Sequence, residues 1–265
     1  MGICPPSMNA NKPFYYFGII TLFPEMFGAL TGFGINRRAL ESGLYDLELL
    51  NPRDFSDDPN HRVDTRPYGG GPGMVMACPP LAASIEASRA RLKEKLGQPP
   101  KVVYLSPQGR PFSSDAISHF QARRGWIFIS GRYEGIDERI LDEYVDEEWS
   151  LGNFVLSGGE LAIMTILDSL IRFIPGALGH DDSALEDSFQ QDLLDCPHYA
   201  RPETFHNRSV PPVLLSGDHK AIATWRRKQS LGRTWLRQPG LLSRKRLSAE
   251  DQSLLEEFIT ELEAG

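Results

Sequence analysis

The chain has 265 residues and a formal net charge of −7, and 41% of its residues are hydrophobic. This composition is typical of globular proteins and excludes a chain that is disordered throughout. The three cysteines, Cys4, Cys78 and Cys196, form no C-x-x-C pair, so the sequence signals neither a disulfide framework nor a zinc site. No apolar run approaches the roughly 18–20 residues that span a bilayer, and the first residues lack the apolar core of a secretory signal. We therefore expect a cytoplasmic protein with no membrane partner.

Short apolar runs alternate with amphipathic segments in the first 180 residues. The apolar runs predict strands over Tyr15–Leu22, Leu44–Leu50, Lys101–Ser106, Trp126–Ser130 and Asn153–Leu156. Helices are predicted over Glu25–Leu30 toward Ala39 and over Cys78–Leu96, Ser114–Arg123, Ile136–Tyr144 and Glu160–Phe173. Strands that alternate with helices predict an α/β domain with a largely parallel sheet.

The pattern changes after the acidic residues 180–195. Helices are predicted over Ser216–Gln229, with Ser216 or Asp218 as the N-cap, and over Ala249–Leu262. The acidic segment itself is polar and has little periodicity, which is typical of a linker. We expect four parts, namely a loose N-terminal extension (1–13), an α/β domain (14–179), an acidic linker (180–192) and a small helical domain (193–265).

The charge is distributed unevenly along the chain. Residues 199–246 hold eleven Lys or Arg and two Asp or Glu, a local charge of +9. Acids gather in 134–148, with eight acids and one arginine, and in 180–195, with six acids and no Lys or Arg. The total of −7 taken alone argues against a nucleic-acid partner, but the basic residues, which are the type that holds phosphates, are concentrated in one segment. This segment therefore indicates a surface that binds nucleic acid.

Three predicted strands run into small, turn-forming loops at Leu105–Gly109, Ile129–Gly135 and Leu156–Glu160. Ligands of open parallel sheets bind beyond the carboxyl ends of the strands, and small residues let a ligand reach the backbone there. Each loop alone is typical of an ordinary turn, but three together favour a ligand site. The loop Tyr68–Met74 (YGGGPGM) fits neither G-x-G-x-x-G nor a P-loop. It is either a loop that closes over a flat ligand or a flexible connector.

Six motifs occur together in this sequence: YGGGPGMVM, YLSPQG, ISGRYEGIDERI, LGNFVLSGGELA, EDSF and LLDCPHYARP. In this order and spacing they closely resemble the bacterial tRNA (guanine-N1-)-methyltransferase family of the SPOUT class. The resemblance covers about Phe17 to Arg227. It implies a SPOUT-type parallel sheet threaded into a deep trefoil knot, with S-adenosylmethionine (SAM) bound in the knot loops. It also implies a homodimer with active sites at the subunit interface.

The resemblance carries the cofactor contacts over to particular residues. They are Ser106, Pro107, Gly131, Tyr133, Glu134, Leu151, Gly152, Asn153, Phe154, Val155, Leu156, Gly158 and Gly159. Where the family often has Ile and Tyr, this chain has Leu151 and Phe154, which keep the apolar bulk. Magnesium is expected to accompany the reaction, but no ligand cluster of fixed spacing is present. The acids Glu134, Asp187 and Asp195 are only candidates, so the metal ligands stay unknown.

Methylation of guanine at N1 needs a general base, because this nitrogen carries a proton in the neutral base. A cation must also stabilise the negative charge that develops at O6. The resemblance implies Asp187 as the base and Arg172 as the cation, whereas the sequence alone favours a solvated acid and a residue that ends a helix. It also implies that the target nucleotide and its neighbours contact Ser188, Asp195, His198 and Arg201.

The expected function is methyl transfer from SAM to N1 of guanosine at tRNA position 37. One alternative is another knotted methyltransferase, acting on rRNA or on a different tRNA site, which EDSF and DCPHYARP disfavour. A second is a non-catalytic RNA-binding protein, which the presence of Asp187 and Arg172 disfavours. A third is a Rossmann-type oxidoreductase, which lacks its glycine fingerprint here.

Overall fold

The computed structural model describes residues 13–179, 187–189, 192–243 and 246–264. The chain divides into two compact units, Met1–Asp181 and Asp182–Gly265. All but the last residue of the expected N-terminal extension, and most of the expected acidic linker, lie outside the described residues. No helix in the part of the chain that the structure describes is long and apolar enough to cross a membrane.

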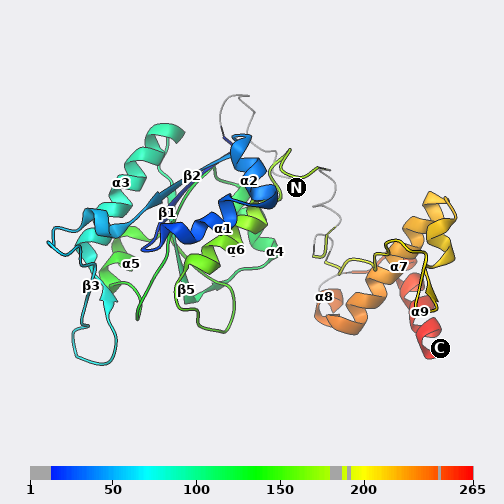
Figure 1. Ribbon diagram of the computed structural model, residues 1–265. Coiled ribbons are helices and arrows are strands. Elements are labelled where there is room, and N and C mark those ends of the chain that lie inside the picture. The colour runs from blue at the N-terminus through cyan, green and yellow to red at the C-terminus, as the bar shows by residue number, and fades with distance from the viewer. Residues whose placement is uncertain (1–12, 180–186, 190–191, 244–245, 265) are drawn as a thin grey trace. The chain divides into compact units, whose positions relative to one another are not determined.

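A five-stranded parallel sheet lies at the centre of the first unit, in the order β2-β1-β6-β5-β7 (Figure 1). The strands are β1 (Tyr15–Ile20), β2 (Tyr45–Leu50), β5 (Lys101–Pro111), β6 (Gly125–Ile129) and β7 (Glu147–Ser150). Every residue of the central strand β6 is buried. Strands that are covered on both faces of a parallel sheet read as nearly continuous apolar runs, which is why β1 and β6 could be recognised in the sequence. The predicted α/β class with a parallel sheet is confirmed.

Helices cover both faces of this sheet. They are α1 (Gly28–Thr31), α2 (Gly34–Glu41), α3 (Cys78–Leu96), α4 (Ser114–Gln121), α5 (Glu138–Tyr144) and α6 (Glu160–Ile171), with the 3-10 helices η1 (Pro24–Phe27) and η2 (Pro52–Phe55). Successive residues of a strand point to opposite faces. Phe17 and Ile19 of β1 accordingly belong to the core that contains residues of α4 and α6, and Tyr16 and Ile20 to the core that contains residues of α3 and α5.

The prediction of a strand over Asn153–Leu156 is wrong. The edge strand beside β5 is instead β7, which begins at Glu147 in the acidic segment 134–148 and continues to Ser150. Phe154 and Val155 are 54% and 83% exposed, so this apolar run does not enter the sheet. The predicted helix toward Ala39 is divided into η1, α1 and α2, and Gly34 at the start of α2 has a φ of +61°.

Short β elements complete the first unit. The strands β3 (Asp64–Thr65) and β4 (Val75–Met76) pair antiparallel and enclose the glycine-rich loop Tyr68–Met74. The isolated bridge between Met76 and Ile136 connects this ribbon to the segment that follows β6. The glycine-rich loop is therefore held next to a carboxyl end of the central sheet.

The second unit is mainly helical. It contains η4 (Pro212–Leu215), α7 (His219–Arg237), α8 (Pro239–Ser243), α9 (Ala249–Ala264) and the hairpin strands β8 (Thr204–Phe205) and β9 (Arg208–Ser209). The Asp218 carboxylate accepts two backbone hydrogen bonds at 3.0 Å, which confirms it as the N-cap of α7. Leu193, Leu231 and Leu254 form a small core.

Candidate functional site

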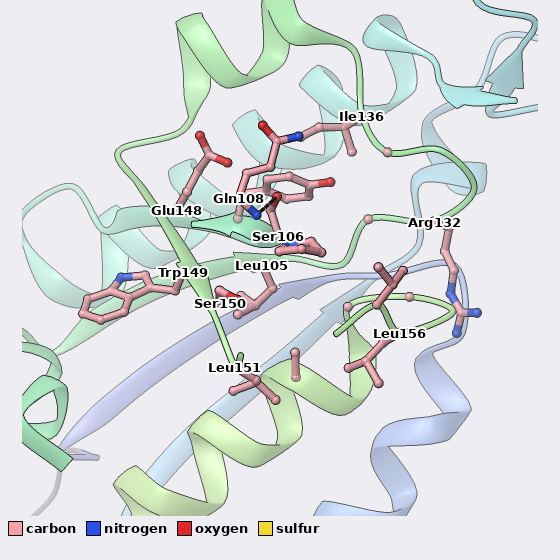
Figure 2. Close-up of a pocket in the computed structure, with 18 of the residues that line it drawn as sticks. Leu105, Ser106, Gln108, Arg132, Ile136, Glu148, Trp149, Ser150, Leu151 and Leu156 are labelled. Atoms are coloured by element: carbon pink, nitrogen blue, oxygen red, sulfur yellow. Dashed lines mark hydrogen bonds between the residues drawn. The ribbon is translucent and has the colours of Figure 1, made fainter. Parts of the chain in front are cut away.

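A cavity of about 430 Å³ lies beside β5, β6 and β7, which are neighbours in the sheet (Figure 2). Three loops form its walls: residues 106–109 within β5, residues 130–136 after β6 and residues 151–159 after β7. We call them the first, second and third loops. Because the strands are parallel, loops that follow their carboxyl ends meet at one edge of the sheet, where ligands of such sheets bind.

The first loop is a bulge inside β5. Leu105 and Arg110 both lie opposite Trp149 of β7, so the four residues between them leave the sheet. The hydroxyl oxygen of Ser106 accepts a hydrogen bond at 3.1 Å from the backbone amide two residues further on. A Cβ atom on Gly109 would lie 2.4 Å from the Trp149 backbone nitrogen, so the return into the sheet requires glycine.

The second loop is bonded to the ribbon β3–β4. The amide of Glu134 donates to the carbonyl of Met74 at 3.0 Å, and the amide of Met76 donates to the carbonyl of Gly135 at 3.0 Å. A Cβ atom on Gly73 would lie 2.3 Å from Oε1 of Glu134. The Glu134 side chain therefore rests against bare glycine backbone, and its position depends on the glycine-rich loop.

The third loop is closed at its start and bonded to the second loop at its end. The Ser150 hydroxyl donates to the Gly152 carbonyl at 3.1 Å and accepts from the Gly152 amide at 3.2 Å. The amide of Gly159 donates to the carbonyl of Gly131 at 3.0 Å. A Cβ atom on Gly159 would lie 2.9 Å from Cα of Ser130. The second and third loops thus pack backbone against backbone, which only glycine allows here.

Acidic side chains dominate the charge of the cavity. Glu134, Glu138 and Glu148 line it, whereas Arg132 is the one basic residue among the described residues of its walls. Burial raises the pKa of the Tyr104 hydroxyl, and the nearby Glu148 charge adds to this effect. An excess of negative charge in a partly enclosed cavity favours a ligand that carries a positive group.

Most of the predicted cofactor residues meet at this cavity. Twelve of the thirteen line it: Ser106, Pro107, Gly131, Tyr133, Glu134, Leu151, Gly152, Phe154, Val155, Leu156, Gly158 and Gly159. The thirteenth, Asn153, is exposed and is not among the lining residues.

The sequence analysis did not single out several other lining residues. Among them are Tyr104, Gln108, Arg132, Glu148 and Trp149. Tyr104 and Gln108 lie within or next to the YLSPQG motif, and Arg132 lies within ISGRYEGIDERI, so the motifs contained the signal. Glu148 and Trp149 lie in β7, which was not predicted as a strand because it begins within the acidic segment 134–148.

A second group of predicted residues lies in the second unit. The amide of Asp195 donates to the Ser188 hydroxyl at 3.0 Å, and Nε2 of His198 lies 2.7 Å from Oδ2 of Asp195. Burial opposes ionisation of Asp195, but the hydrogen bonds from His198 and the Cys196 amide outweigh it, so the pKa of this carboxyl is below its ordinary value. Asp187, which directly precedes Ser188, is half-buried. The structure therefore brings Ser188, Asp195 and His198 into one polar cluster.

His198 and Arg201 line a cavity of about 740 Å³ within the second unit, together with Tyr199 and Arg226. Tyr199 is 49% exposed, and its ring centroid lies 6.3 Å from that of Trp225. Aromatic rings beside basic side chains suit single-stranded nucleic acid, because bases stack on the rings while phosphates pair with the cations. The other predicted catalytic residue, Arg172, is half-buried in the first unit as the C-cap of α6.

One group in the described part of the chain has ligand atoms close enough together to hold a metal ion. Asp195, Cys196 and His198 each offer one atom, and these atoms lie within 4.8 Å of one another. A thiol and an imidazole suit zinc-like ions, whereas Mg²⁺ prefers carboxylate, phosphate and water oxygens. Burial raises the pKa of the Cys196 thiol, with the Asp195 charge adding to it, which opposes thiolate ligation. These residues do not fit magnesium, and we assign no step to it.

Known proteins match this chain over nearly its whole length. Residues 15–244 match the family described as tRNA (Guanine-1)-methyltransferase TrmD. The tRNA (guanine-N(1)-)-methyltransferase of Idiomarina loihiensis is 52% identical over 248 residues, which cover 94% of this chain and 97% of the relative. The protein of the same name from Klebsiella pneumoniae is 54% identical over 246 residues, with coverages of 93% and 95%. That from Salmonella paratyphi C is 53% identical with the same coverages.

Proposed function

This chain belongs to the tRNA (guanine-1)-methyltransferase family, and on that premise we propose that it transfers a methyl group from SAM to N1 of a guanine in tRNA. The observation that carries the proposal is the extent of the family match, because residues 15–244 include both the cavity loops and the polar cluster. We further propose that the target is the guanosine at position 37, next to the anticodon, and that the enzyme acts in the cytoplasm.

The cavity of the first unit suits SAM in size and charge. Its volume of about 430 Å³ falls within the range of ordinary small-molecule sites, roughly 300–1,000 Å³. The glycines of the second and third loops carry no side chains, so a flat base can lie directly against their backbone. Glu134, Glu138 and Glu148 favour the positive sulfonium, which supplies an already activated methyl group when the cofactor is bound.

The acid–base chemistry is assigned to two residues of the chain. The Asp187 carboxylate accepts the proton from N1 as the bond between N1 and the methyl carbon forms and the bond between sulfur and that carbon breaks. The Arg172 guanidinium stabilises the negative charge that develops on O6. Ser188, next to the proposed base, helps to hold the guanine, and its hydroxyl is itself held by the Asp195 amide.

The second unit is proposed to bind tRNA. Its basic segment 199–246 carries the local charge of +9, and the cavity lined by Tyr199, Arg201 and Arg226 combines a stacking surface with cations. This arrangement supports contacts with both the bases and the phosphates of an RNA loop.

We also propose the knot and the homodimer of the family. The close backbone approaches at Gly109 and Gly159 support a chain that is threaded tightly near the cavity. Phe154, Val155 and Leu161 are all at least half exposed in or next to the third loop, which supports a subunit interface there. Sedimentation equilibrium of the wild-type protein and of Val155→Asp tests the dimer, and a monomeric wild type would contradict it.

The function is tested by incubating the protein with methyl-labelled SAM and an unmodified tRNA that carries guanosine at position 37. We expect label at N1 of that guanine, and label at another nucleotide would contradict the target. Asp187→Asn should lower turnover by about 10²- to 10⁴-fold, the usual contribution of a general base, with unchanged cofactor affinity. Asp192→Asn, which removes an exposed acid of the same segment, is the matched control and should retain turnover.

A further inference from the structure

A buried ion pair at the edge of the cavity joins the second loop to the first residue of α6, directly after the third loop. Nη2 of Arg132 lies 2.8 Å from Oε2 of Glu160, and its Nε donates to Oε1 of the same carboxylate at 3.1 Å. The Glu160 side chain is 1% exposed and that of Arg132 is 16% exposed. The Thr21 hydroxyl, just beyond β1, also donates to Oε1 at 2.8 Å. The carboxylate thus connects segments that follow β1, β6 and β7.

Arg132 is also fixed by the third loop. Its Nη1 donates to the carbonyl of Ser157 at 3.1 Å, and its guanidinium carbon lies 4.4 Å from the centroid of the Phe23 ring. A Cβ atom on Gly158 would lie 2.3 Å from Nε of Arg132, so the guanidinium rests directly on glycine backbone. Figure 2 shows the Arg132 side chain running down beside the turn of this loop.

The energetics make this ion pair costly to break. A buried carboxylate without its cation is an uncompensated charge at low dielectric, which is strongly destabilising. Within the described residues, Oε2 of Glu160 accepts no aligned hydrogen bond, so it depends on the positive charge of Arg132. Glu160 is also the first residue of α6, where the helix dipole favours a negative charge.

We propose that Arg132 and Glu160 form a positioning pair that holds the second and third loops in the conformation that binds SAM. The pair acts through the backbone bond between Gly159 and Gly131. This inference rests on the proposed function, because it assigns the cavity to SAM. It also explains why the SGRYEG and SGGE motifs occur together, since each supplies one member of the pair.

Four variants test the pair: Arg132→Met, Arg132→Lys, the double variant Arg132→Met/Glu160→Gln, and the control Arg37→Met. The control removes an arginine from an exposed ion pair in α2, where Arg37 and Glu41 are 53% and 61% exposed. Calorimetry gives the dissociation constants for SAM and for tRNA separately. Steady-state assays give KM and kcat, and thermal melts verify that each variant is folded at the assay temperature.

We expect Arg132→Met to weaken SAM binding by about tenfold or more, equivalent to about 1.4 kcal/mol, with tRNA affinity within about twofold of wild type. KM for SAM should rise by more than kcat falls. The SAM affinity of Arg132→Lys should lie between those of the wild type and Arg132→Met, because an ammonium keeps the charge but not the planar two-nitrogen geometry. The double variant should recover part of the affinity, because the buried carboxylate charge is gone.

Wild-type SAM affinity in Arg132→Met would overturn the inference, as would a lower melting temperature without a change in SAM affinity. If Arg132→Met does not fold, the Lys variant decides, and wild-type KM for SAM in that variant would overturn the pair. A wild-type protein that binds no SAM would instead contradict the proposed function itself. If the wild-type protein binds SAM and the Arg132 variants bind it equally well, the positioning pair alone is contradicted.

Discussion

At Gly73, the missing side chain makes room for the carboxylate of Glu134. The neighbouring Gly71 has a φ of +113° and nothing within 4 Å of an added Cβ, whereas Gly73 has a φ of +84° and would meet Glu134. Alanine would therefore strain the backbone at both positions but collide only at position 73. We expect Gly73→Ala to weaken SAM binding by about tenfold, with Gly71→Ala as the matched control, measured by calorimetry. Equal effects of both variants would show that backbone strain alone is responsible.

Asp137, the N-cap of α5, should make the stability of the fold sensitive to acid. Hydrogen bonds from Arg139 hold the pKa of this carboxyl well below its ordinary 3.8, against the opposing effect of partial burial. A pKa that is lower in the folded state adds stability above the ordinary value, and this stability is lost as the pH falls toward the folded pKa. The free energy of unfolding should therefore decline below about pH 4, and less so in Asp137→Asn, which keeps a capping oxygen. Urea unfolding between about pH 6 and pH 3 measures both slopes, and parallel curves would contradict the assignment.

At the scale of elements, α7 and α9 pack closely at one glycine. A Cβ atom on Gly232 of α7 would lie 2.3 Å from ring atoms of Phe258 in α9. Alanine normally stabilises a helix interior by about 1 kcal/mol relative to glycine, but overpacking costs about 1–3 kcal/mol. Gly232→Ala should therefore lower the thermal stability of the second unit, whereas Gly240→Ala in α8, which meets nothing within 4 Å, should not. Differential scanning calorimetry of the full chain compares the two, and a stabilised Gly232→Ala would contradict the close packing.

A bidentate ion pair also joins α7 to α9. Nε and Nη2 of Arg227 each donate to a carboxylate oxygen of Asp251 at 2.8 Å, and the pair is largely shielded from solvent. This ion pair and the leucine core together hold the two helices against each other.

At the scale of the whole molecule, the uneven charge predicts how tRNA binding depends on salt. The net charge of −7 includes a local +9 in residues 199–246, where Arg208, Arg226 and Arg237 are exposed. Replacing these three arginines by alanine should reduce tRNA affinity and flatten its dependence on salt, by up to about one unit of slope for each phosphate that an arginine neutralises. Affinity for SAM should stay unchanged. Filter-binding titrations over a salt series measure the slope, and an unchanged slope would show that these arginines do not bind phosphates.

Local sequence signals were enough to predict the parallel α/β class and the best-defined helices. The predicted helix Cys78–Leu96 matches α3 at both ends, because Pro79 and Pro80 favour its first turn and Gly97 takes the left-handed conformation that ends it. The strand β7 was missed because its short sequence, EEWS, lies at the end of an acidic run and shows little apolar signal. A helix or strand could thus be predicted where its own residues carry a capping or periodicity signal.

The three-dimensional fold is what brings residues from distant parts of the chain together. It brought twelve of the predicted residues around one cavity, and it paired Arg132 with Glu160, an interaction that no local pattern contains. It also showed that a Cβ atom at Gly73, Gly109 or Gly158 would collide with an atom from a different part of the chain. The physical reason is that periodicity and capping are interactions between near neighbours, whereas a buried charge pair or a close backbone approach depends on which strands lie side by side.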